Sequence, residues 1–122
     1  MTSVTRDVDP SFAVELAERG ARACIALTGP DGAEVMPVKA RHRDDGGWDV
    51  EPLGPGRMPA VGQEVVLLVD AGVEWYDLCA GYVRGAVVRD GGGDAFVLAP
   101  SRTLAWDYGR LRRVPDEEGP TA

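Results

Sequence analysis

Positively charged side chains recur on alternate residues of one short segment of the sequence. Lys39, Arg41 and Arg43 are two residues apart, and Arg57 lies in the loop that follows the next predicted strand. Alternate residues of a strand point to the same side, so the first three cations would share one face. Charge-assisted hydrogen bonds from such cations bind phosphate well. The spacing therefore points to a phosphate site, with a solvated edge strand protected by charge as the alternative.

A second group of candidates lies in the segment TLAWDYGRLRR, residues 103–113. Trp106, Tyr108 and Arg110 are each two residues apart, so in an extended chain they would lie on one side. A tryptophan ring beside a guanidinium group can cover a planar heterocycle through stacking and cation–π contact. The alternative is a segment that closes a barrel, with Trp106 in the core and the arginines at the soluble rim.

Other kinds of catalytic site lack the residues they need. His42 is the single histidine, which leaves little for a Ser-His-Asp or Cys-His arrangement. Together with the two cysteines, Cys24 and Cys79, it makes no credible zinc site, so we expect no metal. No glycine-rich loop of the nucleotide-binding kind opens a helix. We expect both cysteines to be reduced and buried as small hydrophobic residues.

The charge balance excludes several classes of protein. The 122 residues include 20 acidic and 13 basic side chains, a formal net charge of -7. Nucleic-acid-binding domains and proteins bound to membrane surfaces need a basic patch. No apolar run reaches the roughly 20 residues of a spanning helix, and the N-terminus lacks the apolar segment of a signal peptide. We expect a cytoplasmic protein with no nucleic acid and no membrane as partners.

The elements that would position the candidate residues are mostly strands. Asp9 and Pro10 predict the start of a helix of about ten residues, and Gly20 predicts its end. Six strands are predicted at residues 22–28, 33–43, 48–52, 63–70, 76–90 and 95–100. The run QEVVLLVD predicts a strand buried on both sides, and Gly81 and Gly85 predict bends or close backbone approach. The pattern is typical of an all-β barrel or sandwich with one short N-terminal helix.

The length of the chain is that of one domain. Residues 1–8 are polar and expected to be loose, residues 9–114 would form the domain, and residues 115–122 would be a disordered tail. Trp48, Trp75 and Trp106 are more large aromatic residues than a core of this size uses. Because subunit interfaces favour such residues, we expect a homodimer.

The order of these segments resembles the flavin-binding split-barrel family related to pyridoxamine 5'-phosphate oxidase. The resemblance extends over residues 10–113 and includes a leading helix, ACIALTGPDGAEVMPV, GGWDVEP, EVVLLVD, GYVRGAVV and TLAWDYGRLRR. Its most distinctive part is WDYGRL, because the last element of this family often reads Trp-Asp, then a basic residue and Leu.

This resemblance implies a six-stranded antiparallel Greek-key split barrel that forms a homodimer, with flavin mononucleotide (FMN) in a groove between subunits. A deazaflavin coenzyme or haem takes that place in some branches. Lys39, Arg41 and Arg57 would bind the flavin phosphate, and Trp106 and Arg110 would lie at the ring or its edge. The protein would be a flavoprotein oxidoreductase that transfers electrons or hydride to an unknown small substrate.

Two other interpretations stay open. The loop LGPGRMPAVG, residues 53–62, has one arginine and no Ser or Thr, whereas cofactor-binding relatives usually offer hydroxyls and several cations there. A buried phosphate with one firm partner is poorly compensated. The chain could therefore be a non-catalytic split-barrel dimer without tight cofactor binding, acting as a binding or interaction module. An unrelated small β barrel, such as an oligonucleotide-binding fold, is the other interpretation.

Overall fold

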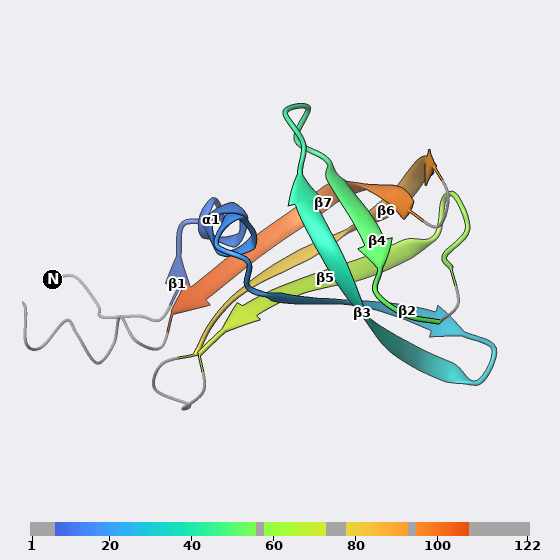
Figure 1. Cartoon of the computed structure of the whole chain (residues 1–122), viewed down its shortest axis with the longest axis horizontal. Helices are drawn as coiled ribbons and strands as arrows, with labels where there is room; N and C mark the ends of the chain where they lie inside the picture. The colour runs from blue at the N-terminus through green and yellow to red at the C-terminus, as the bar shows by residue number, and fades with distance from the viewer. Residues whose placement is uncertain (1–6, 56–57, 73–77, 93–94, 108–122) are drawn as a thin grey trace, which may run out of the picture.

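The structure, a computed structural model, describes residues 7–55, 58–72, 78–92 and 95–107. The elements in this part of the chain are a short helix and strands (Figure 1). They are β1 (Asp7–Val8), α1 (Phe12–Glu18), β2 (Arg22–Gly29), β3 (Gly32–His42), β4 (Trp48–Pro52), β5 (Glu64–Ala71), β6 (Cys79–Gly92) and β7 (Ala95–Asp107). The predicted all-β class with one short N-terminal helix is confirmed.

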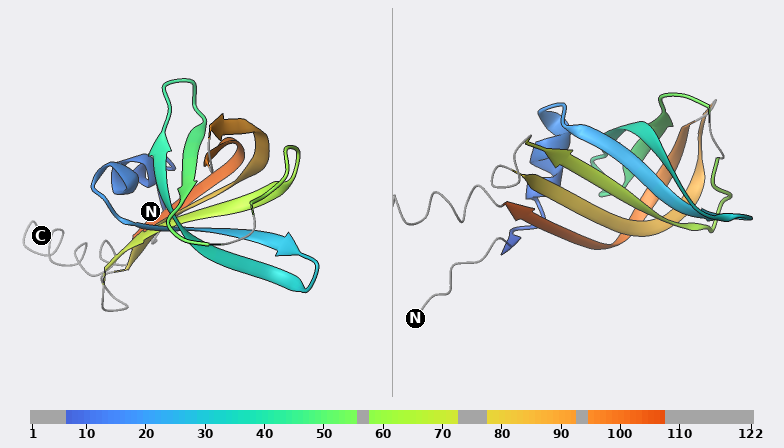
Figure 2. Two further views of the ribbon diagram at one scale, coloured as in Figure 1. Left: turned by 45° about the vertical axis from the view of Figure 1, so that its right-hand side comes forward. Right: turned by 90° about the horizontal axis from the view of Figure 1, so that it is seen from below.

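The strands β2 to β7 form a closed antiparallel barrel. Their order is β7-β4-β3-β2-β5-β6, and β6 also pairs with β7, which closes the ring. The chain crosses the barrel between β4 and β5, because β5 pairs with β2 and not with β4. Figure 2 shows the tilted strands curving around the interior. The six-stranded antiparallel Greek-key barrel that the family resemblance implied is therefore confirmed.

β7 is much longer than the strand predicted at residues 95–100. It continues to Asp107 because β6 pairs with it along its whole length, with three irregularities in register. The segment around Trp106 is thus part of the barrel wall. β1 lies within the N-terminal segment that the sequence predicted to be loose, and its Asp7 pairs with Trp106. The other limits predicted for the domain and its tail stay predictions.

The helix α1 lies across one end of the barrel, against β3, β5, β6 and β7 (Figures 1 and 2). It begins at Phe12 and not at Pro10, because the N–H of Ser11 donates to Asp9 Oδ1 at 2.8 Å in a turn that precedes the helix. Gly20 ends it as predicted, with a left-handed φ of 80°. No helix in the described ranges is long and apolar enough to cross a membrane.

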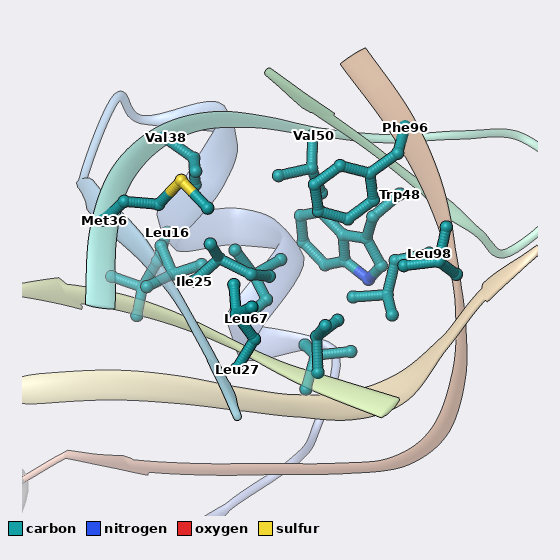
Figure 3. Close-up of a cluster of buried hydrophobic side chains, with 14 residues drawn as sticks. Leu16, Ile25, Leu27, Met36, Val38, Trp48, Val50, Leu67, Phe96 and Leu98 are labelled. Carbon is teal, nitrogen blue, oxygen red and sulfur yellow. The ribbon is translucent and has the colours of Figure 1, made fainter. Parts of the chain in front are cut away.

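A hydrophobic core fills the barrel (Figure 3). Its largest fully buried side chains include Trp48, Phe96, Leu16, Ile25 and Leu67. Trp48 is only 2% exposed, so it is a core residue, and counting it among the interface aromatics was wrong. Trp75, which supported the same argument, lies outside the described residues.

Two glycines of β6 let neighbouring elements approach closely, as the sequence predicted. A Cβ atom at Gly81 would collide with Ala13 of α1, and one at Gly85 would collide with the backbone of Ala99 in β7. A side chain at either position would push α1 or β7 away from β6. Gly81 therefore sets how α1 sits on the barrel.

Replacing Gly81 by alanine should lower the free energy of unfolding by about 1–3 kcal/mol, the usual cost of overpacking. Urea denaturation followed by circular dichroism measures this change. Gly54→Ala is the matched control, because a Cβ atom there meets no other atom within 4 Å. Equal stability of the two variants would mean that α1 does not pack against β6 as described.

Candidate functional site

The outer surface of β3 carries the first predicted cations. Met36 and Val38 point into the core, whereas Lys39 and Arg41 alternate with them and are exposed. The spacing of residues 39 and 41 thus brings both side chains to one outer face, as predicted. His42 points to the opposite side, and its ring contacts Trp48 edge-on at 5.0 Å between centroids.

Lys39 and Arg41 line an open groove of about 510 Å³ on the outer surface of β3 and β4, which we call the Lys39 groove. Its other lining residues are Arg43, Asp49, Val50, Glu51 and Ala95. An adjoining hollow of about 380 Å³ at the β3–β4 turn shares the residues Arg41, Arg43 and Asp49. The two hollows meet at these three side chains, which form the polar centre of the candidate site.

Asp49 is shared between two arginines. Arg41 Nη2 donates to Asp49 Oδ2 at 2.8 Å, and Arg43 Nη1 donates to Asp49 Oδ1 at 2.9 Å. Arg43 Nε also lies 3.2 Å from both carboxylate oxygens of Asp45. The hydrogen bonds from Arg41 and Arg43 lower the pKa of Asp49, so its carboxylate is ionised at neutral pH. Neither of these acidic partners was among the site residues predicted from the sequence.

The two arginines differ in how tightly they are held. The Arg41 side chain is 80% exposed and makes one bond to Asp49, whereas the Arg43 side chain is 26% exposed and is held by two carboxylates. Arg43 is therefore a fixed part of the hairpin. Among the described cations of the groove, a ligand can reach Arg41 and Lys39, which lies opposite Glu51 in the ladder.

Trp106 does not line the Lys39 groove within one chain. β7 pairs with the β3–β4 hairpin where Val97 lies opposite Asp49, and Trp106 lies near the other end of the same strand, beside Asp107. Trp106 is half-buried and pairs with Ala80 of β6. The structure thus brings Lys39 and Arg41 together but not Trp106. Arg57 and Arg110 lie outside the described residues.

The outer surface of the barrel beside β3 is strongly apolar. Residues that pair directly in an antiparallel ladder point to the same side of the sheet. One row of such neighbours crosses β3, β2, β5, β6 and β7, and a second row crosses β3, β2 and β5. Together the two rows form the outer apolar face. Its first row is Pro37, Cys24, Leu68, Tyr82 and Leu104, and its second row is Val35, Ala26 and Val66.

This face explains why the burial of β5 differs from the burial that the sequence predicted. The run QEVVLLVD predicted a strand buried on both sides, but only Val65, Leu67 and Val69 are buried in the core. Val66 and Leu68 belong to the outer apolar face and are half-buried. In a single chain the strand is therefore covered on one side only.

The cysteines are half-buried and unbridged, so the prediction that they are buried is only partly met. Burial, reinforced by the charge of Asp70, raises the pKa of the Cys24 thiol. Cys24 is therefore a protonated thiol at neutral pH and a weak nucleophile. The Cys79 Sγ atom lies 3.8 Å from the carbonyl oxygen of Ala71.

Solved structures with this fold include two proteins of stated name. One is the FAD binding protein from Mycobacterium smegmatis, which aligns with a TM-score of 0.64 at 14% identity over 81% of this chain and 94% of that chain. The other is a provisionally named pyridoxamine 5'-phosphate oxidase from Corynebacterium glutamicum, with a TM-score of 0.58 at 12% identity over 86% of this chain and 94% of that chain. At these identities the likeness shows the fold, and it confirms the split barrel that the resemblance implied. No family model and no curated protein matches the sequence.

Asp49→Asn should destabilise the protein at neutral pH by about 1 kcal/mol or less, as is usual for partly exposed ion pairs. Because the folded-state pKa of Asp49 lies below its usual value of 3.8, this contribution is complete above that pH and is lost as pH falls through the folded-state pKa. Thermal melts of both proteins between about pH 7 and pH 2 should therefore converge at the acid end. A stability difference that stays constant down to pH 2 would contradict the ion-pair assignment.

Proposed function

We propose that the protein binds flavin mononucleotide between two copies of its barrel and acts as an oxidoreductase of the flavin-binding split-barrel group. One observation carries the proposal: the Lys39 groove continues into the outer apolar face. Pro37 and Lys39 are successive outward residues of β3, about 7 Å apart. A ligand with a planar ring and a phosphate group needs an apolar and a cationic surface side by side in this way.

The fold of the neighbouring structures supports a flavin as the ligand. One of them is named for binding FAD, and the other is named for pyridoxamine 5'-phosphate oxidase. In this chain, Lys39 and Arg41 would bind the phosphate from β3, and Arg57 would approach from the loop after β4. FMN fits this arrangement better than a deazaflavin coenzyme or haem, because the cations at the groove favour a compact phosphate group.

A second copy of the chain is the partner that the outer apolar face fits. The residues of the face are uncharged, although Arg84 borders it opposite Val66, and Val35 and Leu104 within it are 67% and 42% exposed. Packing two such faces together removes hydrophobic area from water, which favours association. It would also bring Trp106 of one copy toward the Lys39 groove of the other, which Trp106 does not line within one chain. Arg110 stays a proposed second contact to the flavin ring.

The bound flavin would supply the electron or hydride transfer. The side chains of the protein have simpler tasks in this proposal. Lys39 and Arg41 hold the phosphate, the outer apolar face excludes water from the ring, and Trp106 covers it. Cys24 contributes hydrophobic surface, because its thiol stays protonated. With an acidic chain and no spanning helix in the described part, we propose a cytoplasmic location.

A non-catalytic split-barrel dimer is the second candidate, and the ion pairs of the groove favour it. Asp49 occupies both arginines, and Glu51 lies opposite Lys39, so two carboxylates reduce the attraction of the groove for phosphate. Such a protein would keep the barrel and the dimer and would act as a binding or interaction module.

The purified protein should absorb near 450 nm, roughly where oxidised flavins absorb, or take up FMN when it is added. Replacing both Lys39 and Arg41 by alanine should weaken FMN binding at least about tenfold, because charge-assisted hydrogen bonds are lost. Riboflavin, which lacks the phosphate, should bind the wild-type protein and the double variant equally. Fluorescence titration with each flavin measures these affinities.

Arg19→Ala is the control, because Arg19 is an exposed cation directly after α1 whose ion pair is with Glu15 of that helix. Unchanged FMN affinity in the double variant would place the phosphate elsewhere. A colourless protein that gives no thermal shift with FMN, a deazaflavin or haem would favour the non-catalytic dimer.

Light scattering on a sizing column should show a dimer in solution. Leu104→Asp should convert it to a monomer, because the substitution puts a charge into the outer apolar face. Val88→Asp is the control: Val88 is 49% exposed but lies outside that face, beside the β3–β4 turn. A monomeric wild-type protein, or a dimer that survives Leu104→Asp, would remove the proposed interface.

A further inference from the structure

We infer that Asp49 sets the phosphate selectivity of the Lys39 groove by competing with a ligand for Arg41. This inference rests on the proposed function, because it concerns a flavin phosphate bound in that groove. Asp49 is not one of the residues expected to hold the cofactor. It is a positioning residue that acts through the arginine beside it.

The geometry makes Asp49 a substitute for a bound anion. Each of its two carboxylate oxygens accepts a hydrogen bond from a different guanidinium group, at 2.8 Å from Arg41 and 2.9 Å from Arg43. A carboxylate oxygen at such a distance takes the place that a phosphate oxygen would take on the same donor. A ligand phosphate that accepts a hydrogen bond from the same N–H of Arg41 Nη2 must therefore displace Asp49.

The competition falls on Arg41 and spares Arg43. Arg43 is largely covered and has Asp45 as a second partner, so it stays in place when Asp49 changes. Arg41 is mostly exposed and has one bond to Asp49, so its side chain can turn toward the groove. Removing the charge of Asp49 therefore frees one cation without dismantling the hairpin.

The charges that line the groove also indicate that Asp49 weakens phosphate binding. Lys39, Arg41 and Arg43 line it together with Asp49 and Glu51, so the carboxylates cancel much of the cationic charge. A phosphate dianion gains less from this lining than from three unpaired cations. Asp49 thus keeps phosphate affinity low, and its removal should strengthen binding of phosphorylated flavin only.

The test compares FMN and riboflavin binding by fluorescence titration at about 50 mM salt, where surface charges are weakly screened. Asp49→Asn should bind FMN about two- to fivefold more tightly than wild type, the factor expected from the loss of one exposed ion pair. Riboflavin affinity should not change. In an Arg41→Gln background the same substitution should give no gain, which identifies Arg41 as the mediator.

Asp44→Asn is the control for net charge, because Asp44 is exposed in the turn beside the same arginines. If Asp49→Asn and Asp44→Asn bind FMN equally, the inference is overturned while the proposed function stands. Asp49→Ser replaces Asp49→Asn if the latter does not fold, as judged by circular dichroism.

If the proposed function is wrong, the result is different: neither the wild-type protein nor any variant binds FMN or riboflavin. Inorganic phosphate then decides the inference, with the Nε–Hε signals of arginine followed by NMR. Tighter phosphate binding by the Asp49→Asn variant than by the Asp44→Asn variant would support competition for Arg41. Equal phosphate binding by the two variants would overturn it.

Discussion

A closed barrel buries only the inner side of its strands, and in this chain the outer side is hydrophobic as well. β2, β5 and β6 carry apolar residues on both sides, but the core takes up only the inner set. The outer set forms a continuous surface from β3 to β7. The position of the candidate site depends on this constraint, since the Lys39 groove begins where the apolar surface ends.

The β3–β4 hairpin carries both the cations that attract a phosphate and the carboxylates that partly neutralise them. β3 supplies the cations and β4 supplies Asp49 and Glu51 directly opposite them. Such cross-strand pairs stabilise the hairpin modestly and at the same time moderate its attraction for anions. The same ion pairs therefore serve the fold and limit the strength of any phosphate site on it.

Part of the site could be predicted from the sequence, and part could not. Period-two spacing was enough to place Lys39 and Arg41 on one outer face, because strand geometry fixes that alternation. The partners of these cations were missed, although the turn DDGG between the two strands indicates a register that sets Arg41 opposite Asp49. Trp106 was grouped with residues after it, and nothing local indicated that its strand pairs with β6 along its whole length.

The sequence by itself determined the class of fold, the helix end at Gly20, the close contacts at Gly81 and Gly85, and the alternation along β3. These depend on local backbone preferences and on residue spacing, which are written in short stretches of chain. The tertiary structure alone decided that Trp48 belongs to the core and that the outer residues of five strands join into one apolar surface. Those features arise from pairings between strands distant in sequence, and their register is fixed only when the barrel closes.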